Sequence, residues 1–165
     1  MNEHIQAGFT YLFEWIKDGV VVDSETVHNL LPTEGANYML NASFHGSTQV
    51  TSWYVGLYEG NYTPTVADTA AAFPGAATEC TAYAETTRPA FTSGSASAGV
   101  IDNSANRAEF TSNANKVVYG GFISSVATKG ATTGVLSSAV RFASPRNFDS
   151  GSVLRVTAGF TLTST

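Results

Sequence analysis

The feature that most constrains the fold is a run of residues, 9–16, in which every second side chain is aromatic. A helix would spread these side chains around its axis, whereas the two-residue period of a strand places them all on one face. That face carries Phe9, Tyr11, Phe13 and Trp15. Asp18-Gly19 follows, a pair that favours the positive φ angles of a tight type I′ turn. The sequence therefore predicts a β-hairpin over residues 7–28, with its second strand starting at Val20.

Further strand-like runs occur in the middle and in the C-terminal third of the chain. Residues 52–59 carry apolar side chains on both faces, which predicts a strand in the centre of a sheet. Short runs between turn-forming residues predict five more strands, at about 100–102, 105–111, 116–126, 133–142 and 152–163. Gly120-Gly121, inside one of these runs, indicates a bulge or a close approach of two backbones. Regularly spaced short strands are typical of an antiparallel β-sandwich or a β-barrel.

One short helix is predicted, at about residues 33–44. Thr33 is a candidate N-cap, apolar residues lie inside the segment, and Gly46 stands near its end. Gly35 weakens the helix by about 1 kcal/mol relative to Ala, and a helix of this length is marginal by itself. We therefore expect it to be held by packing on a sheet.

The stretch 60–99 interrupts the strand pattern. It contains three prolines, an alanine-rich run at 70–72 and the low-complexity run 92–99. We expect an irregular, mostly exposed arm, in which short strands near 79–83 and 88–92 provide some order. Long loops of this kind often carry function.

Length and composition limit the classes of function. A chain of 165 residues fits one domain, and we expect residues 1–165 to form a single β-sandwich. Charged residues make up only 13% of the sequence, while 38 residues are Ser or Thr. The surface is therefore rich in hydroxyl groups and has few long side chains to immobilise, which suits a protein that packs against neighbours over large areas.

Nucleic acid and membrane are not expected partners. The net charge is −5, and the three Lys and five Arg residues are spread along the chain, whereas phosphate-backbone binding needs clustered cations. There is no run of about 18 apolar residues, and the first residues have neither a basic region nor an apolar stretch. We expect synthesis in soluble form without a Sec-type signal.

A search for catalytic or metal-binding patterns leaves few candidates. The three histidines, His4, His28 and His45, have no metal-ligand spacing, and Cys80 is alone, so we expect neither a metal site nor an intrachain disulfide. Glu79 and Glu85 are the only acids that suggest a glycosidase-like carboxylate pair, and solvated charges are the simpler interpretation. Nucleophile-elbow, phosphate-loop and dinucleotide motifs are absent from the sequence. We therefore predict no enzyme activity, no catalytic residue and no cofactor.

Aromatic residues provide the candidate binding surfaces. The stripe at positions 9–15 could stack on sugars, but a stripe at strand period is more often core. Tyr54, Tyr58 and Tyr62 form a second cluster, on or just after the central strand. Tyrosine is common at protein interfaces because it combines large area with a polar group, so these three residues are the candidate interface with a partner or host.

Several segments together resemble a family of small virion structural proteins of tailed bacteriophages. The resemblance is carried first by residues 28–41 and 51–58, and it continues along nearly the whole chain. The later segments are Thr63 to Ala71, Thr81-Ala82-Tyr83, Arg88-Pro89-Ala90, Asp102-Asn103-Ser104-Ala105, Gly120-Gly121-Phe122, Lys129-Gly130 and Ser152-Val153-Leu154. These motifs are short, and they are structural rather than catalytic.

This resemblance implies a capsid cement or decoration protein. It implies a β-sandwich of jelly-roll type, made in the host cytoplasm, that binds the major capsid protein on the exterior of the virion and associates with itself as a trimer. Two other hypotheses remain open. The tyrosines and the aromatic stripe suit a tail-tip, fibre or receptor- or carbohydrate-binding module, and Glu79 with Glu85 would be needed for a glycan-degrading enzyme.

Overall fold

The first of two antiparallel sheets is built around the N-terminal and C-terminal strands. We describe residues 5–164 from a computed structural model of the chain. β1 (Ile5–Lys17) lies between β2 (Val20–His28) and β10 (Val153–Ser164). On its other edge β10 pairs with two short strands, β6 (Val100–Asp102) and β7 (Ala108–Thr111). The first and last strands of the chain are thus neighbours in one layer.

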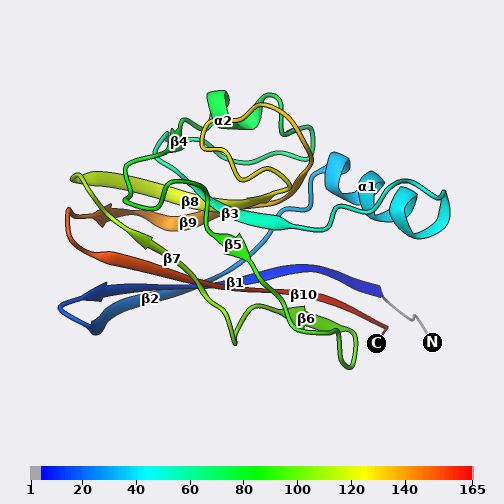
Figure 1. Cartoon of the computed structure of the whole chain (residues 1–165), viewed down its shortest axis with the longest axis horizontal. Coiled ribbons are helices and arrows are strands. Elements are labelled where there is room, and N and C mark those ends of the chain that lie inside the picture. The colour runs from blue at the N-terminus through cyan, green and yellow to red at the C-terminus, as the bar shows by residue number, and fades with distance from the viewer. Residues whose placement is uncertain (1–4, 165) are drawn as a thin grey trace.

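The second sheet comes from the middle of the chain. β3 (Trp53–Tyr58) pairs with β8 (Lys116–Ser124), which pairs in turn with β9 (Leu136–Phe148). Two-residue strands, β4 (Glu79–Cys80) and β5 (Ala90–Phe91), lie on the other side of β3. Figure 1 shows the two sheets as stacked layers. The prediction of a mainly β, sandwich-like fold is confirmed.

The N-terminal hairpin forms as its turn chemistry predicts. Asp18 has φ 50° and Gly19 has φ 76°, and these two residues join β1 to β2. A type I′ turn requires this left-handed conformation at both central positions. The register shifts between Trp15 and Ile16, where β2 contains one extra residue. The hairpin spans residues 5–28, slightly longer than predicted.

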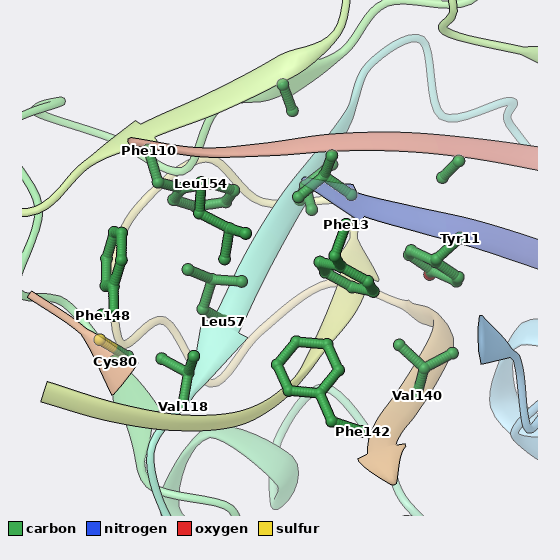
Figure 2. Packing of buried hydrophobic residues seen from close by; sticks show 14 of the residues in the cluster. Tyr11, Phe13, Leu57, Cys80, Phe110, Val118, Val140, Phe142, Phe148 and Leu154 are labelled. Carbon is green, nitrogen blue, oxygen red and sulfur yellow. The ribbon is translucent and has the colours of Figure 1, made fainter. Parts of the chain in front are cut away.

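The aromatic stripe of β1 fills the space between the sheets. Tyr11 and Phe13 have no exposed surface, and the outer members of the stripe, Phe9 and Trp15, are also buried. Figure 2 shows Tyr11 and Phe13 in the core with residues of the second sheet. The edge of the Phe142 ring meets the face of Phe13, with ring centroids 4.7 Å apart. The interpretation of the stripe as core is therefore confirmed.

The segment after β3 is irregular, and β4 and β5 lie within the two short strands that were predicted there, but its first part is not a free arm. We call residues 60–91 the covering segment: residues 60–78 fold back over the outer face of the second sheet and include a single helical turn, α2 (Phe73–Ala76), and the rest contributes β4 and β5 to the edge of that sheet (Figure 1). The Phe73 side chain has no exposed surface and meets Tyr58 and Phe122, which project from that outer face. The second sheet carries apolar side chains on both faces, so its outer face must also be shielded from water by another part of the chain. Residues 61–67 and the following stretch, residues 92–99, are largely exposed.

The predicted helix exists with the predicted bounds, as α1 (Thr33–Phe44). Its N-cap is Pro32 rather than Thr33, and no side chain caps the first turn. Gly35 is the buried residue of this helix, and a β-carbon there would lie 2.8 Å from the backbone oxygen of Ser137 in β9. The glycine that weakens the helix is therefore what lets it approach the second sheet closely.

A carboxylate also fixes the start of α1. One oxygen of Glu34 accepts hydrogen bonds from the backbone N–H groups of Ala70, at 2.8 Å, and Leu136, at 2.6 Å. These donors come from the covering segment and from β9. A single side chain therefore joins α1, the covering segment and the second sheet.

The paired glycines of β8 allow a close approach, as predicted. The register between β8 and β9 shifts between Val118 and Gly120. A β-carbon on Gly120 would lie 2.0 Å from the backbone oxygen of Val140 and 2.6 Å from the Tyr58 hydroxyl oxygen. Only glycine leaves room for the Tyr58 hydroxyl, which donates a 3.0 Å hydrogen bond to the Val140 oxygen.

Candidate interaction surface

The three predicted interface tyrosines do not form one exposed patch. Tyr58 has no exposed surface, because Phe73 and the covering segment lie over it. Burial raises the pKa of its hydroxyl far above the usual range. Tyr58 is therefore a core residue with no surface to offer a partner. Tyr54 remains half-buried on β3.

Tyr62 is half-buried and stabilises the covering segment. Its ring meets the edge of Phe73, and its hydroxyl donates a 2.6 Å hydrogen bond to Asp68. This hydrogen bond is the main reason that the pKa of Tyr62 is raised. Asp68 also accepts a hydrogen bond from the Thr65 N–H at 2.8 Å, and the Tyr62 backbone oxygen accepts one from Arg141 of β9, so the polar groups of Tyr62 have partners within the chain.

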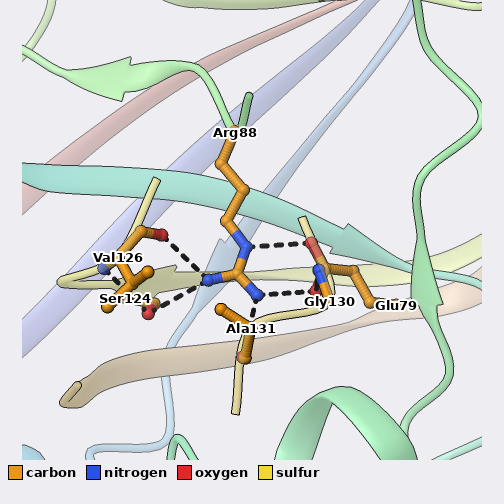
Figure 3. A network of polar contacts seen from close by, with 6 residues as sticks. All are labelled: Glu79, Arg88, Ser124, Val126, Gly130 and Ala131. Atoms are coloured by element: carbon orange, nitrogen blue, oxygen red, sulfur yellow. Dashed lines mark hydrogen bonds and ion pairs between the residues drawn. The ribbon is translucent and has the colours of Figure 1, made fainter. Parts of the chain in front are cut away.

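The predicted acid Glu79 belongs to a buried ion pair. Arg88 has almost no exposed surface, and its Nε and Nη2 donate to the two oxygens of Glu79 at 2.8 and 2.6 Å (Figure 3). The same carboxylate accepts a hydrogen bond from the Gly130 N–H at 2.8 Å. Both carboxylate oxygens are occupied, so Glu79 serves to hold the fold together.

Arg88 also binds the loop that follows β8. Its Nη1 donates to the Val126 backbone oxygen at 2.9 Å and to the Ser124 hydroxyl at 3.3 Å. Nη2 donates to the Ala131 oxygen at 3.4 Å. We call this set the Arg88 network; its members are Glu79, Arg88, Ser124, Val126, Gly130 and Ala131 (Figure 3).

The second predicted acid also has a structural partner. Both oxygens of Glu85 accept a hydrogen bond from the Thr111 N–H, at 3.0 and 3.1 Å. Glu85 therefore attaches the covering segment to β7 of the first sheet. Neither Glu79 nor Glu85 lines the apolar groove described below.

The histidines and the cysteine do not form a cluster in residues 5–164. His28 is exposed beside the Thr10 hydroxyl, with Nδ1 and Oγ1 3.0 Å apart, and His45 is the C-cap of α1. His4 lies outside the described residues. No group of three or more His, Cys, Asp or Glu side chains in the described chain could hold a metal ion. Cys80 is buried, and burial raises the pKa of its thiol from 9.0 to about 11.

An apolar groove of about 610 Å³ lies between α1 and the two sheets. Side chains from α1, from β1, β6 and β10 of the first sheet, and from β3, β5, β8 and β9 of the second sheet line it. Its apolar members are Ala7, Phe9, Leu31, Ala36, Tyr38, Met39, Leu40, Ala42, Phe44, Val50, Trp53, Phe91, Ile101, Ile123, Phe160 and Leu162. Gln49, Ser43, Ser93 and Ser137 complete the lining, which contains no charged residue.

The groove exists because the first sheet extends beyond its cover. Ala7 and Leu162 are paired across β1 and β10, two residues beyond the pair formed by Phe9 and Phe160. Since side chains alternate between faces, Ala7 and Leu162 face the same side as the core aromatics. Leu162 is nonetheless 56% exposed. Apolar side chains thus continue along the inner face to a point where neither the second sheet nor α1 covers them.

Exposed apolar residues of α1 border this groove. Leu40 is 59% exposed, and Phe44, the last residue of the helix, is 85% exposed. Isolated exposed apolar residues are normal, but a groove rimmed by several of them is typical of an interaction site. Neither residue was predicted from the sequence to be part of an interface. Their signal in the sequence is a run, 35–58, that contains no Asp, Glu, Lys or Arg.

The described chain contains no helix that is long and apolar enough to cross a membrane. Comparisons with protein-family models and with curated proteins find no match for this chain.

Proposed function

We propose that this protein is a structural component of a bacteriophage virion that binds the outer surface of the capsid and cements the shell. The observation that supports this best is that the side chains considered as catalytic or interface candidates have structural roles inside the fold. Glu79 pairs with Arg88, and Glu85 accepts a hydrogen bond from the backbone N–H of Thr111. Tyr58 is buried in the core. An uncharged apolar groove is left exposed, which suits assembly with other protein subunits rather than catalysis.

The resemblance to cement proteins adds the finer parts of this proposal. They are a jelly-roll arrangement of the sandwich, the major capsid protein as partner, association as a trimer, and a location on the exterior of the virion after synthesis in the host cytoplasm. The two sheets and the covering segment make a rigid body with a hydroxyl-rich surface. Such a body can lie across a junction between shell subunits without immobilising many long side chains.

Cementing follows from mass action. A protein that binds only the assembled shell stabilises it by its own binding free energy, and many copies act on one particle. Modest contacts for each copy are therefore sufficient. The stabilisation needs neither a cofactor nor a chemical step.

The direct test uses shells that lack the protein. Purified protein is added to them, and we measure bound copies per particle and the temperature at which the shells rupture. We expect saturable binding and a higher rupture temperature. Absence of binding at saturating protein would refute the proposal.

The alternative is a tail-tip, fibre or receptor-binding module. This alternative was based on the aromatic stripe of β1 and on the tyrosines. The stripe is buried and cannot bind a receptor, whereas Tyr54 and Tyr62 keep partly exposed surface. Imaging of intact particles separates the two locations. Density for this protein at the tail alone would favour the alternative.

A further inference from the structure

The described segments that meet around the apolar groove contain no acidic, lysine or arginine side chain. These segments are residues 5–13, 35–58, 89–101 and 156–164. The whole chain, by contrast, has a net charge of −5. Two copies of an acidic protein repel each other unless they meet through a surface without like charges. This end offers such a surface.

The same end provides both a cavity and a side chain that can fill one. Phe44 borders the groove and is 85% exposed, so its own groove does not enclose it. Leu40 lies one helical turn earlier and is 59% exposed. Buried aromatic side chains that fill a partner's pocket contribute most of the binding energy in many interfaces.

The position of the two features permits closed association. Because Phe44 and the groove belong to one surface, a rotation axis near this end can bring Phe44 of each copy to the groove of another. The contact then closes into a small symmetric oligomer. A projecting side chain and a pocket at opposite ends would instead favour an open chain of copies.

We propose that the apolar groove is the surface through which copies of this chain associate, with Phe44 and Leu40 of one copy seated in the groove of the next. The proposal rests on the homo-oligomer of the proposed function and assigns its contact surface. The occupant is a second copy because one surface carries both the groove and the exposed Phe44 side chain that can fill it, and its described segments have no like charges that would keep two acidic copies apart.

Sedimentation equilibrium of the purified full chain tests this assignment without any shell. The test variants are Phe44→Ser and Leu40→Gln. Val22→Ser is the matched control, since Val22 is 62% exposed, close to the value for Leu40, and lies on β2 outside the groove lining. All four proteins are compared over a hundredfold range of concentration.

We expect the parent chain to self-associate and Phe44→Ser to weaken its association constant roughly 30-fold or more, as for a central aromatic residue. Leu40→Gln should weaken it less, and Val22→Ser should match the parent. A parent chain that stays monomeric throughout, or a Phe44→Ser variant that associates like the parent, overturns the assignment. Equal weakening by Val22→Ser also overturns it.

The shell-binding test separates this result from the proposed function. If the chain associates through the groove but does not bind shells, the proposed function fails and the assigned surface stands. If a monomeric parent chain binds and stabilises shells, the assigned surface fails alone.

Discussion

Two regions of this molecule use their side chains in opposite ways. Around the Arg88 network, the covering segment is held to the second sheet by buried charge, and each hydrogen-bonding group of the guanidinium and carboxylate has a partner. Around the apolar groove there is no charge, and large apolar side chains are left exposed. The first region satisfies its polar groups internally. The second leaves apolar surface that the chain does not itself cover.

The contrast separates stability from association. A buried, fully partnered charge tolerates little change, because removal of one partner leaves the other unpaired in the interior. An exposed apolar side chain contributes little to folding, because it is in water before and after the chain folds. Substitutions in the first region should therefore change the free energy of unfolding. Substitutions in the second should change self-association and leave folding almost unaffected.

The largest effect is expected from Arg88→Met. The change removes the guanidinium and leaves the Glu79 carboxylate buried without its cation. Loss of one partner of a buried pair costs about 3–5 kcal/mol. Urea unfolding of the variant and the parent chain measures this difference. A loss below about 1 kcal/mol would contradict the role given to the Arg88 network.

The double variant Arg88→Met with Glu79→Leu tests the cause of that loss. Because it removes both charges together, no carboxylate stays unpaired, and replacement of a whole buried pair is often nearly neutral. We expect the double variant to recover much of the stability that Arg88→Met loses. If the double variant is even less stable than Arg88→Met, the unpaired carboxylate is not the source of the effect.

Gly120→Ala should destabilise the covered side of the second sheet by about 1–3 kcal/mol. The added methyl group would lie 2.0 Å from the Val140 oxygen, so the backbone or the Tyr58 ring must move. Gly75→Ala is the matched control, because its β-carbon would meet nothing within 4 Å. Thermal unfolding of both variants measures the difference. Equal melting temperatures would show that β8 and β9 are not tightly packed at this point.

Single strands, turns and the helix of this fold can be predicted from residues that are close together in sequence, whereas the position of the covering segment cannot. The hairpin at Asp18-Gly19, the bounds of α1 and the close approach at Gly120 each depend on a few neighbouring residues, so the sequence predicts them well. The covering segment depends on the outer face of β3 and β8, which is distant in sequence. Pro64, Pro74 and Pro89 indicate irregular structure but not burial.

Alkaline pH should weaken the packed region through Cys80. Burial raises the pKa of its thiol from 9.0 to about 11, so the unfolded chain loses this proton at lower pH than the folded chain. The stabilisation is complete below pH 9 and is lost as pH rises towards 11. The loss from this group is about 1 kcal/mol at about pH 10.

Comparison with Cys80→Ala isolates this contribution, since the buried tyrosines also favour unfolding at high pH. We expect the stability of the parent chain to fall more steeply than that of Cys80→Ala between pH 8 and 10 in denaturant titrations. Parallel curves for the two proteins would contradict a strongly raised thiol pKa.

The candidate site illustrates a limit of residue-by-residue reasoning. Tyr58 was selected because tyrosine is common at interfaces, and a residue type does not reveal which face of a strand is covered. Leu40 and Phe44 were placed inside a helix without a reason to expect them exposed. The missing information is the length of the first sheet relative to the second. Only the assembled layers reveal that difference.

The smallest effect on folding is expected at the groove. Phe44 is 85% exposed, so Phe44→Ser should change the free energy of unfolding by no more than about 0.5 kcal/mol when measured at a concentration where the parent chain is monomeric. At higher concentration the parent chain should gain stability by mass action and the variant should not. The gap between their melting temperatures should therefore widen with concentration. A gap that is large and independent of concentration would mean that Phe44 belongs to the folded core of each copy, and the division between the two regions would fail.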